Sequence, residues 1–381
     1  MLLSLFRMRP EPLADYGRTG SSEIRRRETN QSLSGLEPGG DTHGPRTRSA
    51  PTWSPRPLDR WLEISKGEQL TSDPHDTQDR PSVAVVGTGA IGAYIASRLL
   101  QAGIVATLCA RSPRERIVVQ HPDGETTLGP VLTDPAAITE PVRWAIVTTK
   151  ATDKAGIGPW LDALAGPETT VVVAQNGVEQ DEAVPSLPSL PSRATVLPAL
   201  VYVSAERLDD ETVRHHGFDK LVVPDGELGV AFSALFEGTP VSVERVSDFR
   251  TAAWRKLLAN VANSPLTTVL DCRLGVIQQS PELEALASDL MAEAVAVARA
   301  EGAELGEDDV AATIAAVKTF PADGSSSMRS DRNAGRPLEH EALTGVVVRR
   351  GLARGIPVPL NQAMLRLLRA IDQQRLDNVR G

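Results

Sequence analysis

A row of polar side chains at helical spacing is the first feature of this sequence that could support chemistry. The row consists of Lys256, Asn260, Asn263, Ser264 and Thr267, in the segment WRKLLANVANSPLTTV. Short amide and hydroxyl groups around a single lysine on one helical face are typical of a pocket for a small, oxygen-rich substrate. The alternative is a solvated helix face. Pro265 lies inside the segment and is expected to break or kink the helix.

A glycine pattern, GxGxxG, is the second candidate, within residues 83–103. Gly87 permits a tight turn, Gly89 lets backbone N–H groups approach a pyrophosphate, and Gly92 allows close packing of helix on strand. The N-terminus of the following helix adds a favourable dipole for phosphate. The pattern alone is weak, but its position between an apolar run and a helical segment favours a dinucleotide-binding loop. A glycine-rich turn without a ligand is the alternative.

The residue that discriminates between NADH and NADPH is expected after the second strand of such a fold. Folds that prefer NAD usually carry Asp or Glu about 20 residues after the glycine pattern, where it binds the ribose 2′-hydroxyl. This sequence has Arg111 there. A guanidinium can bind a 2′-phosphate through paired donors, so Arg111 favours NADPH over NADH. The alternative is a solvated charge at the end of a strand.

Apolar runs alternate with helical segments from residue 81 onward. Strands are expected at 83–87, 105–110, 144–150 and 170–177, and residues 196–206 and 221–230 are expected to continue the same sheet. This alternation predicts βαβ units and a parallel sheet. After about residue 247 the periodicity is helical, with Ser280 as an N-cap, Pro281 in the first turn and Gly302 at the end of one helix.

The predicted fold is therefore an α/β Rossmann-type N-terminal domain with a parallel sheet, residues 81–247, followed by an all-α C-terminal domain, residues 248–375. Residues 1–80 are rich in Pro, Gly, Ser and Arg and predict a disordered N-terminal extension. An over-extended translation start is the alternative. The first ten residues, MLLSLFRMRP, contain too short an apolar run for a secretory signal. The extension as a whole contains too many acidic residues for a mitochondrial transit peptide.

Composition narrows the class of protein. The 381 residues carry a net charge of −9, which argues against a general nucleic-acid or anionic-membrane binder. The two cysteines form no CxxC pair and the six histidines are scattered, so we expect reduced thiols in a cytoplasmic protein and no metal site. No apolar run approaches the ~20 residues that a membrane span needs.

Taken together, these motifs resemble the ketopantoate reductase family, the 2-dehydropantoate 2-reductases, from about Pro81 to Ile371. The matching segments are GTGAIG, TTKATDK, AQNGVEQ, WRKLLAN and SSSMRSDRNAGRPLEHEALTG. The resemblance implies that NADPH is bound by Gly87, Thr88, Gly89, Ala90, Ile91, Gly92, Arg111, Lys150 and Asn176. It implies that the substrate is bound by Asn176, Lys256, Asn260, Ser264 and Ser327, with Lys256 and Glu339 as catalytic residues.

The activity that this resemblance implies is reduction of 2-dehydropantoate to pantoate, in pantothenate and coenzyme A biosynthesis. The Lys256 ammonium would polarise the 2-oxo group and protonate the nascent alkoxide. Glu339 would either orient the substrate hydroxyl or hold Lys256 in place. A structural salt bridge between these two residues is the alternative.

Two positions depart from the family pattern. Ser264 and Leu274 stand where the family usually has asparagines. Serine can still donate a hydrogen bond, but leucine cannot, so an NADPH-dependent reductase of a different 2-oxo acid is a rival interpretation. A non-catalytic NADPH-binding protein is a second rival, against which Lys256 and Glu339 count together. The sequence leaves the oligomeric state open, a homodimer included.

Overall fold

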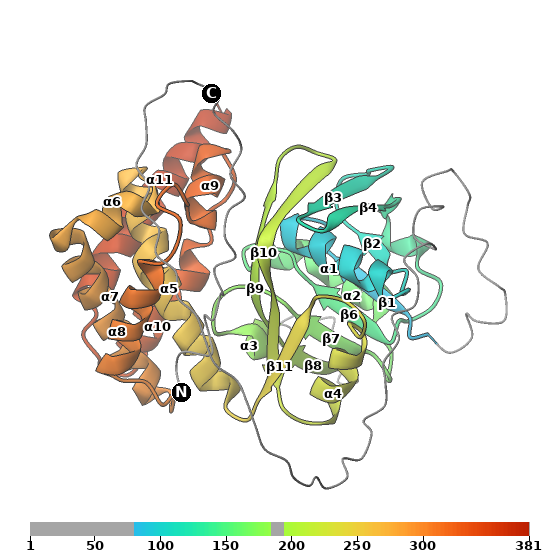
Figure 1. Cartoon of the computed structure of the whole chain (residues 1–381), viewed down its shortest axis with the longest axis horizontal. Helices are drawn as coiled ribbons and strands as arrows, with labels where there is room; N and C mark the ends of the chain where they lie inside the picture. The colour runs from blue at the N-terminus through green and yellow to red at the C-terminus, as the bar shows by residue number, and fades with distance from the viewer. Residues whose placement is uncertain (1–79, 184–193, 381) are drawn as a thin grey trace, which may run out of the picture. The chain divides into compact units, whose positions relative to one another are not determined.

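The computed structural model describes residues 80–183 and 194–380, which belong to the compact unit Asp79–Gly381. The expected N-terminal extension, residues 1–80, lies outside the described residues apart from Arg80. Along the described chain, a mainly α/β region is followed by a region of helices (Figure 1).

The first sheet has six strands, all parallel, in the order β5-β2-β1-β6-β7-β8. They are β1 (Val83–Val86), β2 (Thr107–Cys109), β5 (Val131–Leu132), β6 (Trp144–Val147), β7 (Thr170–Val173) and β8 (Thr195–Pro198). The strand order changes direction between β1 and β6, where sheets of this type bind ligands beyond the carboxyl ends of the strands. The predicted Rossmann-type parallel sheet is confirmed.

Strand β1 shows how helices cover both faces of this sheet. Its odd-numbered residues pack in one core with α1 (Ala90–Gln101), and its even-numbered residues pack in another with α2 (Lys154–Leu164). Successive strand side chains point to opposite faces, so a run of four apolar residues buries both.

The second sheet has five strands and corrects one expectation. They are β3 (Ile117–His121), β4 (Gly124–Leu128), β9 (Leu200–Arg207), β10 (Thr212–Pro224) and β11 (Ser242–Val246). The expectation that residues 196–206 and 221–230 continue the first sheet is right only for β8. Strands β9 and β10 pair antiparallel in the second sheet, and α4 (Glu227–Ala234) follows them.

The connection between β9 and β10 gives the physical reason for this difference. The Asp209 carboxylate accepts hydrogen bonds from the N–H groups of Glu211 and Thr212, at 2.8 and 2.7 Å, and so closes a short turn. A parallel neighbour in the first sheet would need a crossover of about a dozen residues, which this turn does not supply.

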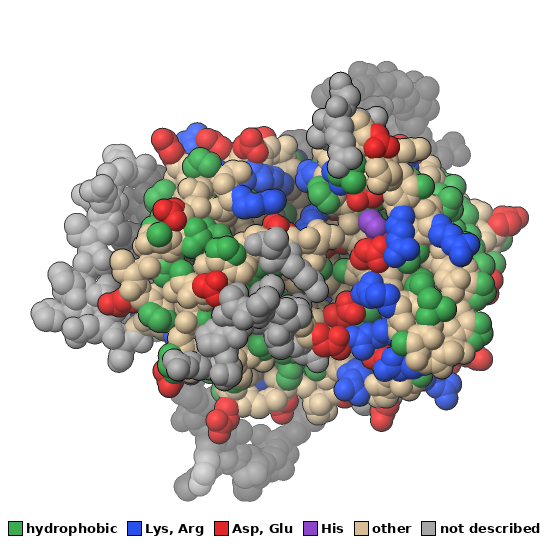
Figure 2. Space-filling view, turned by 180° about the vertical axis from the view of Figure 1, so that it is seen from behind, with side chains coloured by type: hydrophobic (Ala, Val, Ile, Leu, Met, Phe, Trp, Pro, Cys, Tyr) green, Lys and Arg blue, Asp and Glu red, His purple; other side chains and the backbone are tan. Residues whose placement is uncertain are grey.

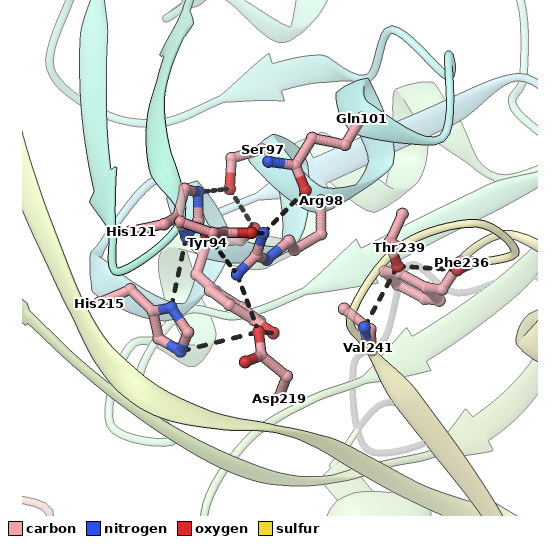
Figure 3. A network of polar contacts seen from close by, with 11 residues as sticks. Tyr94, Ser97, Arg98, Gln101, His121, His215, Asp219, Phe236, Thr239 and Val241 are labelled. Atoms are coloured by element: carbon pink, nitrogen blue, oxygen red, sulfur yellow. Dashed lines mark hydrogen bonds and ion pairs between the residues drawn. The ribbon is translucent and has the colours of Figure 1, made fainter. Parts of the chain in front are cut away.

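A buried polar network joins helix α1 to the second sheet (Figure 3). It consists of Tyr94, Ser97 and Arg98 from α1, His121 from β3, and His215 and Asp219 from β10. The Tyr94 hydroxyl donates to the Asp219 carboxylate at 2.5 Å, and the two histidine Nδ1 atoms lie 3.3 Å apart. This network fixes the helix that begins at the glycine loop.

Acidic and basic side chains are interspersed over the described residues on the face shown in Figure 2. Ion pairs elsewhere in the described chain include Arg350–Glu301, at 2.6 Å, and Arg349–Glu179, at 2.9 Å. Opposite charges at this spacing largely cancel at longer range.

The C-terminal region is helical, as predicted. Its helices are α5 (Phe249–Leu270), α6 (Leu274–Gln279), α7 (Pro281–Ala300), α8 (Glu307–Val317), α9 (Ser327–Asn333), α10 (His340–Ala353) and α11 (Pro359–Arg380). The Ser280 hydroxyl caps α7 by accepting from the N–H of Leu283 at 3.3 Å, and Gly302 follows its end with φ +84°. Among the described helices, none is long and apolar enough to cross a membrane.

Helix α5 runs through Pro265 without a break, so of the expected break or kink the break is wrong. A proline inside a helix costs about 3 kcal/mol because one hydrogen bond is lost. Helix α5 offsets this cost because nearly all residues from Leu257 to Thr268 are buried among the other helices. Asn263, Ser264 and Thr267 are also buried, at 8%, 2% and 0% exposed, so the solvated-face alternative is wrong for this part of the polar row.

A short α3 (Gln180–Ala183) and a 3-10 helix, Pro135–Ala137, complete the described elements of the α/β region.

Candidate active site

Lys256 and Glu339 from the helical region meet at Asn176 from the parallel sheet. The Lys256 ammonium donates a hydrogen bond to the Asn176 side-chain oxygen at 3.0 Å, and the Asn176 amide donates to Glu339 at 3.4 Å. Asn176 follows β7, so it lies at the carboxyl edge of the sheet, where open α/β sheets bind their ligands. Three residues that the sequence predicted from separate motifs therefore form one continuous chain of contacts.

Gly177 allows the loop after β7 to approach helix α10. Its φ is +109°, and a Cβ at this position would lie 3.0 Å from the carbonyl oxygen of Ala342. Any other residue would be strained there and would push the loop away from α10. This glycine therefore helps to bring Asn176 within reach of Glu339, which directly precedes α10.

The environment of Lys256 adjusts its acidity. Burial lowers the pKa of Lys256 to about 8, and the Glu339 carboxylate acts in the opposite direction. The ammonium nitrogen also lies 5.6 Å from the centroid of the Tyr202 ring. An ammonium group that is protonated at neutral pH and has a lowered pKa is suited to donate a proton to a developing alkoxide.

Glu339 is held by backbone as well as by side chains. It is 6% exposed, and its carboxylate accepts a hydrogen bond from the N–H of Ala151 at 3.3 Å. Burial raises the pKa of Glu339, and the positive charge of Lys150 and the hydrogen bonds from Ala151 and Asn176 oppose that rise. The structure shows no direct ion pair between Lys256 and Glu339 among the described residues, so the salt-bridge alternative is not what holds them together.

The glycine loop has the shape that a dinucleotide requires. A Cβ at Gly87 would lie 2.7 Å from Thr149, and a Cβ at Gly92 would collide with the carbonyl oxygen of Gly87. A Cβ at Gly89 would meet no atom within 4 Å, so the open side of the loop is here. The N-cap residue of α1 is Gly89, which has no side chain to occupy the first N–H groups of the helix, so these suit a pyrophosphate.

The other predicted cofactor-binding residues lie in or near the glycine loop. Thr88 is 3% exposed, and Ala90 and Ile91 form the first turn of α1. Arg111, after β2, is exposed, and its guanidinium lies 3.5 Å from the carboxylate of Asp153.

Lys150 makes a contact that the sequence did not predict. Its ammonium is paired with the buried carboxylate of Asp331 on α9, which also accepts a hydrogen bond from Arg336 at 2.9 Å. Lys150 therefore joins the sheet to the helical region in this structure. Asp331 lies within the motif that carries Ser327 and Glu339, and that proximity was the one signal that could have revealed it.

The structure places three of the five predicted substrate-binding residues, Asn260, Ser264 and Ser327, on two helices. Asn260 and Ser264 continue the helical row after Lys256 on α5, and Ser327 is the first residue of α9. The Thr267 hydroxyl and the Ser326 hydroxyl lie 2.6 Å apart and hold the start of α9 against α5. Among the described residues, no hydrogen bond joins Asn260, Ser264 or Ser327 to the Lys256–Asn176–Glu339 chain.

Leu274, the second departure, is the first residue of α6 and is 6% exposed. Its N–H donates to the carbonyl oxygen of Gly324 at 3.0 Å. This position therefore supports the segment that leads to α9.

A loop shaped for a pyrophosphate and a half-buried lysine at the carboxyl edge of the same sheet are suited to carbonyl reduction with a nicotinamide cofactor. Fold and site together define a nicotinamide-dependent oxidoreductase. Two family models give the particular family: "Ketopantoate reductase PanE/ApbA" matches residues 83–227, and "Ketopantoate reductase PanE/ApbA C terminal" matches residues 248–372.

Curated relatives support the same assignment. The chain is 40% identical over 290 residues to a 2-dehydropantoate 2-reductase of Mycobacterium tuberculosis, with 76% of this chain and 97% of the relative covered. It is 40% identical over 293 residues to the enzyme of that name from Caulobacter vibrioides, with 76% and 98% covered. The chain therefore belongs to the ketopantoate reductase family, as the sequence predicted.

Solved structures show the same fold. A ketopantoate reductase from Ralstonia eutropha has a TM-score of 0.70 and 31% identity, covering 77% of this chain and 99% of its own. A dimeric ketopantoate reductase from Staphylococcus aureus has a TM-score of 0.70 and 27% identity, with the same coverage. D-mandelate dehydrogenase with NADH also has a TM-score of 0.70 at 19% identity, covering 77% of this chain and 99% of its own, which shows the fold alone.

Proposed function

We propose that this protein reduces 2-dehydropantoate to pantoate with NADPH, in the synthesis of pantothenate and coenzyme A. The observation that carries the proposal is the chain of contacts from Lys256 through Asn176 to Glu339. It sets a proton donor beside the sheet edge at which a nicotinamide lies in folds of this type.

When bound, the reduced nicotinamide supplies the hydride to the 2-oxo carbon. Lys256 polarises the carbonyl oxygen and gives it a proton as the alkoxide forms, which completes the hydroxyl group of the product. Asn176 accepts a hydrogen bond from the Lys256 ammonium and thereby aims it. A positioned acid of this kind contributes about 10²–10⁴-fold to the rate.

Glu339 influences Lys256 in two ways: it orients Asn176, which contacts Lys256, and its own negative charge acts on the ammonium group. Its carboxylate accepts from the Asn176 amide at 3.4 Å and favours the protonated form of Lys256. We therefore assign Glu339 as a positioning residue, which is one of the two roles that the sequence left open. Asn260, Ser264 and Ser327 supply the polar groups for the substrate carboxylate and hydroxyl.

We assign NADPH as the preferred cofactor. The open side of the loop at Gly89 and the start of α1, whose N-cap is a glycine, suit the pyrophosphate of either nicotinamide cofactor. The preference for the 2′-phosphorylated form is supported by the positive charge of Arg111 at the end of β2, where an acid would repel that phosphate.

The departures at Ser264 and Leu274 support a second candidate, an NADPH-dependent reductase of a different 2-oxo acid. A substrate panel separates the two functions. The rate of NADPH absorbance loss is measured with 2-dehydropantoate, 2-oxoisovalerate and pyruvate. A kcat/KM that is highest for 2-dehydropantoate supports the first function, and a higher value for another acid supports the second. Binding of NADPH without turnover of any acid would contradict both.

We place this reaction in the cytoplasm, which the two unpaired thiols, Cys109 and Cys272, support. We also propose a homodimer, supported by the description of the Staphylococcus aureus relative as dimeric. Sedimentation of the purified protein at the mass of one chain would contradict the dimer.

A further inference from the structure

Arg114 lies against the glycine loop but belongs to none of the motifs described above. It follows β2 in the segment ARSPRER, and its guanidinium donates a hydrogen bond to the Thr88 hydroxyl at 2.7 Å. Thr88 is the second residue of the loop and is 3% exposed. The Arg114 side chain therefore rests on the loop that would hold the cofactor.

Backbone hydrogen bonds also hold the glycine loop and Arg114 next to the end of β2. The N–H of Gly87 donates to the carbonyl oxygen of Cys109 at 2.8 Å, so the loop adjoins the end of β2. The carbonyl oxygen of Arg114 accepts from the N–H of Val131, whose strand β5 pairs with β2. In folds of this type, the adenosine ribose lies between the glycine loop and the end of the second strand.

Arg114 and Arg111 differ in their ion pairing. Among the described residues, no ion pair within 4 Å involves Arg114, whereas Arg111 lies 3.5 Å from the carboxylate of Asp153. Burial and the positive charge of Arg207 lower the pKa of Arg114, and only Asp210 opposes them. A partly buried guanidinium that has no carboxylate within ion-pair distance among the described residues, beside a phosphate-binding loop, is well suited to receive an anionic group.

We propose that Arg114 is a binding residue for the adenosine 2′-phosphate of NADPH and contributes more than Arg111 to the preference for NADPH over NADH. The proposal deepens the function given above and rests on it. The guanidinium keeps one donor on Thr88, which orients it, and offers its remaining donors to the phosphate. Arg111, being exposed and already paired, adds a more strongly screened interaction.

The test measures dissociation constants for NADPH and NADH, and for 2′,5′-ADP and 5′-AMP, by fluorescence titration and calorimetry. Arg114→Gln should weaken NADPH and 2′,5′-ADP by about ten- to a hundred-fold, which is the loss of a charge-assisted hydrogen bond. NADH and 5′-AMP should bind as to the unchanged protein. Arg111→Ala should show the same selectivity with a smaller effect.

The matched control is Arg116→Gln. Arg116 belongs to the same segment but is exposed and donates to Glu211 at 3.1 Å, so its removal should leave all four constants unchanged. Thr88→Val tests whether Arg114 merely braces the loop. Bracing predicts that Thr88→Val and Arg114→Gln weaken both cofactors equally, and that result would overturn the proposal.

The two levels of failure are distinguishable. An unchanged protein that binds NADH as tightly as NADPH would overturn the cofactor assignment itself. A strong preference for NADPH that survives Arg114→Gln would overturn only the role of Arg114. If Arg114→Gln lowers the Tm without cofactor, Arg114→Lys serves instead. It keeps the charge and should retain most of the NADPH preference, and loss of that preference with NADH binding intact would contradict a charge-based role.

Discussion

At the residue scale, the acidity of Lys256 results from two opposing influences. Burial lowers its pKa to about 8, and the negative charge of Glu339 limits the fall. The balance keeps the ammonium protonated near neutral pH while bringing its pKa closer to the working pH than that of an ordinary lysine. Asn176 uses its oxygen for Lys256 and its amide for Glu339, which fixes its orientation.

Lys256→Ala should therefore abolish the proton donor without disturbing the glycine loop. We expect kcat to fall by about 10²–10⁴-fold, while the dissociation constant for NADPH stays unchanged. Lys220→Ala is the matched control, since its ammonium also lies over the Tyr202 ring, at 5.3 Å, but is paired with Glu244. An unchanged kcat in Lys256→Ala would remove this residue from the mechanism.

The pH dependence tests the coupling between Glu339 and Lys256. Because the reaction needs the ammonium form, kcat/KM should fall as pH rises through about 8. Glu339→Gln removes the negative charge that favours the ammonium, so the falling limb should move to lower pH. A limb that stays in place or moves to higher pH would contradict the positioning role, whatever the change in the maximal rate.

Residue types and local spacing explain why some of the site could be predicted. Lys256 and Glu339 lie in motifs, and the short polar groups after Lys256 mark a buried helix face. Asp331 and Arg114 were missed because a charged residue on a loop or short helix has no periodic pattern that reveals its partner. Only the folded chain shows that Asp331 meets Lys150 and that Arg114 meets Thr88.

At the element scale, a buried hydroxyl on helix α5 contacts the residue that caps α9. The Thr267 hydroxyl donates to the carbonyl oxygen of Asn263 at 2.6 Å and lies 2.6 Å from the Ser326 hydroxyl. The neighbouring Thr268 hydroxyl is also buried, yet it makes no hydrogen bond within the described part of the chain. Of these two adjacent threonines, Thr267 stabilises the fold through its hydrogen bonds, whereas the buried Thr268 hydroxyl costs free energy because it makes none.

Thr267→Val should lower the free energy of unfolding by about 1–2 kcal/mol, because buried partners lose their hydrogen bonds. Thr268→Val should be neutral or stabilising, since it removes a buried hydroxyl that makes no bond. Urea unfolding measures both. Substrate KM should rise only in Thr267→Val, which frees the start of α9 and so Ser327. Equal effects of the two substitutions would contradict this account.

The network that joins α1 to the second sheet predicts acid sensitivity. Burial, followed by the charge of Arg98, lowers the pKa of His121 to about 4 from an ordinary value of 6.5. Between these values the unfolded chain binds a proton that the folded chain excludes, so stability should fall as pH falls through this window. Unfolding titrations at pH 7 and 5 measure the loss.

His121→Asn should reduce this pH slope, because it removes the buried imidazole that the folded chain keeps unprotonated. Equal stability of the unchanged protein at both pH values would show that the buried histidines are not excluded from protonation.

Elements themselves were predictable where periodicity was strong. The buried strands β1, β6 and β7 and the amphipathic α7 follow directly from their apolar patterns. The second sheet was not predicted, because whether β9 and β10 join the first sheet depends on a short turn and on long-range pairing with β3 and β11. The continuity of α5 through Pro265 could not be predicted for a similar reason, since burial by other helices decides whether a helix continues through a proline.

At the scale of the whole molecule, the site depends on residues from both regions of the described chain. Asn176 and Lys150 come from loops of the parallel sheet, whereas Lys256, Asp331 and Glu339 come from the helices. The sequence predicted both regions but not their mutual contacts, which bring residues far apart in the chain together. The family resemblance supplied the roles of the individual residues, and the structure supplies the order in which they touch.

The central claim is the identity of the substrate, and a competition experiment tests it most directly. The purified protein receives NADPH deuterated at C4 on both faces, together with equal concentrations of 2-dehydropantoate, 2-oxoisovalerate and pyruvate. Mass spectrometry then shows which hydroxy acid carries deuterium at C2. We expect labelled pantoate to dominate. Label in another hydroxy acid while pantoate stays unlabelled would contradict the proposed function and leave the fold and cofactor loop as described.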